Sequence, residues 1–140
     1  MSDAYHFYKK GLAALASGHA DEAIVPLERA KKLEPDSMSI HEALGKTYLR
    51  LGFYDRAIAE FSTILDKEPI DAYAHFCIAK AYDKLTRDKL ARRHYRLASF
   101  FDPERAIYRD TLRVFMHRAF PDGLDQFDED EDDAYGETYS

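Results

Sequence analysis

The sequence predicts an all-α solenoid built from three copies of one helix-turn-helix unit, and three observations support this prediction. Three prolines lie 34 residues apart each time: Pro35, Pro69 and Pro103. Small residues share one slot of this period: Ala23, Ala57 and Ala91. Large apolar residues share the slot four positions later: Leu27, Phe61 and Tyr95. Repeats of this kind are typical of solenoids, in which each unit buries its apolar face against its neighbours.

The first copy, residues 4–37, is expected to form two helices. Gly18 is expected to end the first helix, because glycine is the usual residue just past a helix end. Asp21 and Glu22 favour a start of the second helix near them, since carboxylates stabilise the positive N-terminal end of a helix. Pro26 lies inside this second helix and is expected to bend it, because proline removes a backbone hydrogen bond.

The second copy, residues 38–71, has the most regular pattern. Ser39 and Glu42 have the spacing of a capping box, which favours a helix start at this point. Gly45 and Ala57 are small, so they are expected to let the two antiparallel helices of this copy approach closely.

The third copy, residues 72–105, keeps the same pattern but has Thr86 where the earlier copies have Gly18 and Gly52. One more helix is expected over residues 106–120. It would cover the last apolar face, because solenoids need a terminal cap with a polar outer surface.

The last stretch, residues 121–140, differs from the rest in charge. It contains nine acidic residues and no base, whereas residues 1–120 contain 17 acidic residues and 20 bases. Such charge density with few apolar residues predicts a disordered tail. The expected organisation is therefore a repeat domain over residues 1–120 followed by an acidic tail.

The 34-residue pattern resembles the tetratricopeptide repeat over residues 4–105. The resemblance implies a right-handed superhelix of antiparallel helix pairs, in which the first helix of each pair lines a concave groove that binds a peptide or helix of another protein. It thus implies a non-catalytic adaptor. The groove positions implied by the resemblance are Tyr5, Tyr8, Leu12, Glu42, Lys46, Leu49, Tyr73, Phe76 and Lys80.

One tetratricopeptide subgroup grips the C-terminal carboxylate of heat-shock chaperones with charged and amide side chains. The matching positions here hold Tyr8, Leu12, Ala43, Tyr73 and Cys77. None of these side chains donates the charge-assisted hydrogen bonds that hold a carboxylate, so no such clamp is expected. An aromatic, apolar groove instead suits a segment with hydrophobic anchors. The alternative is that its aromatic rings pack against each other or against the tail.

The sequence contains no spacing that indicates catalysis, a metal or a cofactor. There is no glycine-rich phosphate loop, no HExxH and no Cys-x-x-Cys. His41 and His75 share one slot of the repeat, where packed side chains or groove contacts are commoner outcomes than metal ligands. Cys77 has no base or acid nearby in the sequence, so a nucleophile is not expected.

Basic residues gather in the third copy and the following helix, namely Lys89, Arg92, Arg93, Arg96, Arg105, Arg109 and Arg113. Three interpretations are open: a solvated face, a nucleic-acid site, or a docking place for the acidic tail. A nucleic-acid site is disfavoured because the whole chain has a net charge of −6. A separate alternative to the adaptor is a self-associating protein, in which the tail or end helix of one chain enters the groove of the next.

The sequence also favours a cytoplasmic protein. No apolar run approaches the roughly 20 residues that span a bilayer, and the N-terminus lacks the features of a secretory signal. A single cysteine fits a reducing compartment.

Overall fold

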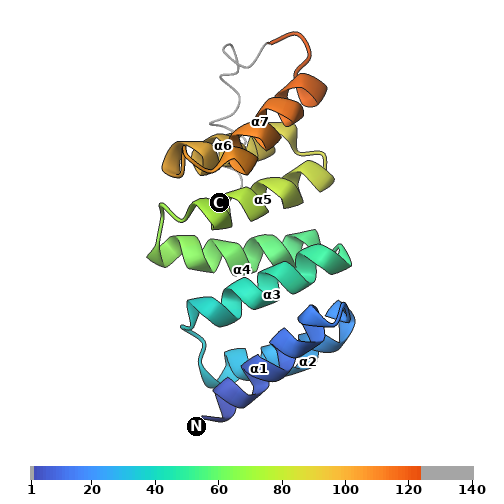
Figure 1. Cartoon of the computed structure of the whole chain (residues 1–140), viewed down its shortest axis with the longest axis vertical. Helices are drawn as coiled ribbons and strands as arrows, with labels where there is room; N and C mark the ends of the chain where they lie inside the picture. Colours follow the sequence, from blue (N-terminus) through green and yellow to red (C-terminus); the bar gives the residue numbers. More distant parts are fainter. Residues whose placement is uncertain (1, 124–140) are drawn as a thin grey trace. The chain divides into compact units, whose positions relative to one another are not determined.

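The computed structural model describes residues 2–123, and within that range it contains seven α-helices and no strand (Figure 1). This confirms the all-α prediction. The helices are α1 (Asp3–Ala16), α2 (Ala20–Leu33), α3 (Met38–Leu51), α4 (Tyr54–Lys67), α5 (Ala72–Lys84), α6 (Asp88–Phe101) and α7 (Ala106–Ala119). The predicted tail from residue 124 onwards lies outside the described residues.

The chain forms two compact units, Met1–Pro69 with α1 to α4 and Ile70–Ser140 with α5 to α7. In the first unit α2 packs against both α1 and α3, and α3 packs against α4. The core contains the small and large residues that recur with the repeat, and is formed by Leu15, Ala23, Leu27, Ala30, Ile40, Ala43, Leu44, Tyr48 and Ala57. Burying this apolar surface is the main favourable contribution to folding.

Two glycines allow the helices of the first unit to approach closely. A Cβ atom on Gly45 would lie 2.5 Å from the Phe61 ring, and one on Gly11 would lie 2.4 Å from the Leu27 side chain. Both distances are shorter than atoms tolerate. The predicted close approach at Gly45 is therefore confirmed, and the same arrangement occurs one repeat earlier.

The start of α3 differs from the prediction. Ser37 is its N-cap residue, and its hydroxyl accepts a hydrogen bond from the Ile40 amide at 3.4 Å. Ser39 lies already inside the helix, so the predicted capping box with Glu42 is wrong. Asp71, 34 residues after Ser37, caps α5 through the Ala74 amide. The repeat thus extends to the caps.

The turn inside each helix pair requires a left-handed residue. Gly18 and Gly52 adopt φ values of 80° and 82°, and Thr86 adopts 56° at the equivalent place. Glycine takes this conformation at no steric cost, whereas a β-branched side chain is strained there. The turn at Thr86 is therefore less favourable than the equivalent turns at Gly18 and Gly52.

In the second unit α6 packs against α5 and α7. The buried face of α7 consists of Tyr108 and Phe115, which are 4% and 2% exposed. The Phe115 ring lies 4.9 Å from the Tyr95 ring of α6. The last helix therefore covers apolar surface of the preceding pair. Among the described helices, none is long and apolar enough to cross a membrane.

Candidate partner-binding surface

The first part of the predicted groove lies along one side of α1, where Tyr5, Tyr8 and Leu12 follow one another at helical spacing. Tyr5 and Leu12 keep 45% and 37% of their area exposed. Tyr8 is half-buried and packs against the core of the first unit. The Lys9 ammonium group lies 5.6 Å from the centre of the Tyr5 ring. This side of α1 thus presents apolar area to solvent.

A hollow of about 300 Å³ lies where the beginning of α1 meets the beginning of α3. Tyr5 and Tyr8 line it, together with Ser2 and Ala4 of the same segment. The other lining residues come from the α2–α3 connection and the start of α3: Glu34, Ser37, Ser39 and Ile40. None of these four was predicted as a groove residue, because their positions depend on the path of the connection. A helical period does not reveal that path. The hollow combines two tyrosine rings with a polar rim.

The predicted groove residues of α3 are Glu42, Lys46 and Leu49, and all three are half-buried. Leu49 packs against the core of the first unit. None of the three lines the hollow beside Tyr5. Of the predicted set, Tyr5 and Tyr8 are thus the members that line this hollow.

In the second unit, the predicted groove residues of α5 have different environments. Lys80 is exposed, Tyr73 is half-buried, and Phe76 is 9% exposed. The Phe76 ring lies 4.8 Å from that of Tyr108 in α7 and 5.9 Å from that of Tyr95 in α6. Phe76 therefore packs mainly against the aromatic rings of α6 and α7.

His41 is buried and its imidazole is held at both nitrogens. Nδ1 lies 2.7 Å from a carboxylate oxygen of Glu60, and Nε2 lies 2.6 Å from the carbonyl oxygen of Pro35. The Lys31 ammonium group of α2 donates to the other Glu60 oxygen at 2.9 Å. Glu60 therefore connects α2, α3 and α4, and the packed role expected of His41 is confirmed.

His75 occupies the equivalent slot in α5 and is also buried. Its Nδ1 lies 3.0 Å from Nδ1 of His94 in α6. Burial lowers the pKa of His94 to about 3, and the neighbouring His75 and Arg93 charges act in the same direction. His94 is therefore neutral at physiological pH.

The described residues contain no group of three or more side chains that could hold a metal ion. The thiol of Cys77 is buried, with 3% of the residue exposed.

The predicted basic face of α6 is split by burial. Arg92 is fully buried, and its guanidinium lies 4.3 Å from the centre of the Phe120 ring. This corrects the expectation that Arg92 lies on the outer surface with its neighbours. Arg93 and Arg96 line an outer hollow of about 390 Å³ with Leu97 and Phe100. Lys89 is half-buried.

The basic residues predicted on α7 and just before it are exposed. The Arg105 side chain lies 3.1 Å from Asp102, and those of Arg109 and Arg113 lie 3.7 Å and 3.8 Å from Asp110. Exposed pairs of this kind contribute little to stability. These basic side chains are therefore exposed and partly neutralised by acids of their own segment.

A second ionic contact of α7 was not predicted. Arg118 donates to both carboxylate oxygens of Asp83 in α5, at 2.8 Å and 2.9 Å. The Tyr95 hydroxyl of α6 donates to the same carboxylate at 3.2 Å. Asp83 and Arg118 are 35 positions apart in the sequence, and no local pattern links them.

Comparisons with known proteins agree with this architecture. A family model described as tetratricopeptide repeat matches residues 42–106. Superkiller complex protein 3 of Homo sapiens is 28% identical over 89 residues, and that of Mus musculus is 29% identical over the same length. These matches cover 64% of this chain and 6% of each relative. The chain thus corresponds to a small part of those proteins.

Solved structures show the same fold. MamA from Desulfovibrio magneticus RS-1 superposes with a TM-score of 0.78 at 23% identity, covering 83% or 82% of this chain in two structures and 65% of MamA in both. The first TPR of Spaghetti (RPAP3), bound to the HSP90 peptide SRMEEVD, gives 0.77 at 18% identity and covers 83% of this chain and 92% of that one. The Arabidopsis OM64 TPR domain gives 0.75 at 19%, covering 85% and 95%. At these identities the likeness concerns the fold.

Proposed function

Because this chain is a tetratricopeptide repeat protein, we propose that it is a non-catalytic adaptor that binds a peptide or helical segment of another protein. The fold is that of a protein-interaction module. We place the binding surface along α1, beside the hollow that Tyr5 and Tyr8 line with the start of α3.

The single observation that supports this placement is the exposed apolar area next to that hollow. Tyr5 and Leu12 keep more than a third of their area in contact with water. Exposed aromatic side chains at a concave place are typical anchors of protein interfaces. The polar rim formed by Glu34, Ser37 and Ser39 would fix the orientation of the bound segment through hydrogen bonds.

The chemistry of the surface favours an apolar anchor over a terminal carboxylate. The related RPAP3 domain is bound to the HSP90 peptide SRMEEVD. In this chain the clamp positions of α1 are Tyr8 and Leu12, and neither offers a cationic donor. The proposed ligand is therefore an internal segment that inserts an aromatic or aliphatic side chain.

The remaining parts of the proposal follow the repeat pattern. The repeats are assigned to residues 4–37, 38–71 and 72–105, residues 106–120 form the capping helix, and residues 121–140 form the acidic tail. We propose a cytoplasmic location, because a single cysteine fits a reducing compartment.

The test is a selection of binding peptides from a random display library with the full chain. Peptides with one or two apolar anchors are expected, with dissociation constants in the micromolar range. Tyr5→Ser should weaken their binding at least tenfold, because it removes the exposed ring beside the hollow. The core should stay intact, because Tyr5 is exposed. Phe100→Ser, which removes an exposed ring from α6, is the matched control and should change nothing. Peptides that bind Tyr5→Ser as well as the unmodified chain would contradict the proposed surface.

A further inference from the structure

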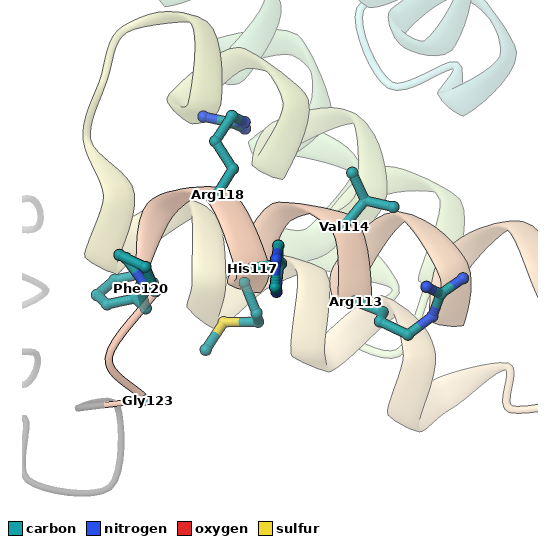
Figure 2. Close-up of a pocket in the computed structure, with 8 residues that line it drawn as sticks. Arg113, Val114, His117, Arg118, Phe120 and Gly123 are labelled. Atoms are coloured by element: carbon teal, nitrogen blue, oxygen red, sulfur yellow. The ribbon is translucent and has the colours of Figure 1, made fainter.

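A second hollow, of about 740 Å³, lies at the end of the described chain beside α7. Figure 2 shows Arg113 and Val114 on one turn of α7 and His117 on the next, with Phe120 and Gly123 where the chain leaves the helix. All of them line the hollow, together with Met116, Arg118 and Pro121. Val114 keeps 59% of its area exposed, although it is apolar. We call this cavity the α7 hollow.

The α7 hollow has an apolar floor and a cationic edge. Val114, Met116 and Phe120 supply the apolar part. At the edge, the side chain of Arg113 is 73% exposed, and its contact with Asp110 is a loose 3.8 Å. Arg118 is different, since Asp83 already binds its guanidinium through two oxygens. Arg113 is therefore the arginine at this edge that an incoming carboxylate can approach most easily.

The segment that follows Gly123 has the complementary chemistry. It reads LDQFDED over residues 124–130, with two apolar side chains three positions apart and then a run of acids. We propose that this segment docks in the α7 hollow of its own chain, with Leu124 and Phe127 over the apolar floor and the acids from Asp128 onwards facing Arg113.

The lengths of the two elements permit this arrangement. Phe127 follows Gly123 by four residues, and four extended residues reach at most about 14 Å. The seven residues from Phe120 back to Arg113 rise only about 10 Å along the helix. Phe127 can therefore reach the turn of Val114 and His117, and the following acids come alongside Arg113.

Because the segment is covalently attached next to the α7 hollow, weak contacts are enough to hold it there. The segment begins at a residue that lines the cavity, so its effective concentration there is in the millimolar range. An acidic segment of another molecule would have to exceed this concentration to displace it. Because the edge contacts are solvent-exposed ion pairs, the docking should weaken as salt screens them.

The experiment uses the full chain with a nitroxide label at residue 130, introduced by Asp130→Cys. Cys77 is buried, so labelling under native conditions selects the new cysteine. At low salt the label should reduce the amide signals of Val114 and His117 by more than half. Adding Phe127→Ala or Arg113→Glu should restore at least half of the lost intensity, as should about 0.5 M salt. Arg109→Glu, one turn away and outside the hollow, is the matched control and should leave the broadening unchanged.

Three results would overturn the proposal. The first is undiminished signals at Val114 and His117 in the labelled chain at low salt. The second is broadening centred on another surface, such as Tyr5 and Tyr8. The third is equal broadening when a labelled chain is mixed with a separate isotope-enriched chain, because that outcome assigns the contact to a second copy. Phe127→Ala changes none of the residues of α7, so its result does not depend on whether Arg113→Glu folds.

Discussion

The α3–α4 pair and the α5–α6 pair use different chemistry at the same two slots. His41 and His75 are 34 residues apart, and so are Glu60 and His94. In α3–α4 the contact joins an imidazole to a carboxylate at 2.7 Å. In α5–α6 it joins two imidazoles at 3.0 Å. One backbone arrangement therefore accepts either a potential ion pair or a neutral pair.

Because of this difference, the two pairs should respond differently to protonation. Glu60 is an acceptor only, and Lys31 supplies a permanent positive charge on its other oxygen. Between His75 and His94 one nitrogen must donate and the other accept, so a proton on both would leave two donors facing each other. In the first repeat the same slots hold Phe7 and Pro26, which cannot titrate at all. Acid should therefore affect the second unit most strongly at this slot.

Removal of the Glu60 carboxylate should lower the free energy of unfolding more than any other change tested on these pairs. Glu60→Leu would leave the Lys31 ammonium and the His41 imidazole without their shared acceptor in a largely buried place. We expect a loss of about 3 kcal/mol in the free energy of unfolding, the lower end for a broken buried pair, because Lys31 is partly exposed. Urea unfolding monitored by circular dichroism measures it. Glu68→Leu, an exposed position, should stay within about 0.5 kcal/mol, and an equal loss in both variants would refute the role of Glu60.

Acidification should reveal the second pair. The pKa of His94 is about 3 in the folded state against 6.5 when unfolded, so the unfolded chain binds the extra proton as pH falls below 6.5. Stability from this group is complete above pH 6.5 and is lost progressively toward pH 3. Each pH unit costs at most about 1.4 kcal/mol, which predicts a loss of about 2 kcal/mol between pH 6.5 and pH 5.

His94→Phe should remove most of that slope, since a phenyl ring does not titrate. Urea unfolding at a series of pH values compares the two chains, and His117→Phe on the exposed side of α7 is the control. A slope that survives in His94→Phe would assign the acid sensitivity to other groups.

The turns should give the smallest effect. Thr86 is held at φ 56° where Gly52 adopts 82°, so Thr86→Gly should stabilise the second unit by about 1 kcal/mol through relief of strain. The reverse change, Gly52→Thr, should destabilise the first unit by a similar amount. Thermal unfolding measures both, and a stabilising Gly52→Thr would show that the turn conformation does not limit stability.

The repeat period made most of the fold predictable. Small slots such as Gly45 follow directly from the 34-residue spacing, because two helices at close approach leave no room for a side chain there. The caps were harder to place, since Ser37 and Ser39 are both plausible and only the first lies before the helix. Sequence spacing resolves a helix face better than a helix end.

The candidate site was only partly predictable. Tyr5 and Tyr8 follow from the helix period, but the hollow beside them also needs the α2–α3 connection with Glu34. Arg92 shows the opposite problem. Its charge suggests exposure, yet the Phe120 ring lies over its guanidinium, and no pattern links two residues so far apart in the chain. Contacts between helices depend on three-dimensional packing that a period does not encode.

The contact between Arg118 and Asp83 also has a kinetic consequence. The last turn of a terminal helix usually frays, because few neighbours hold it. Here the guanidinium ties that turn to α5, and the same carboxylate accepts a bond from Tyr95 of α6. Opening the end of α7 therefore requires breaking contacts to two other helices. The end of α7 should therefore open less often than a helix end without such contacts.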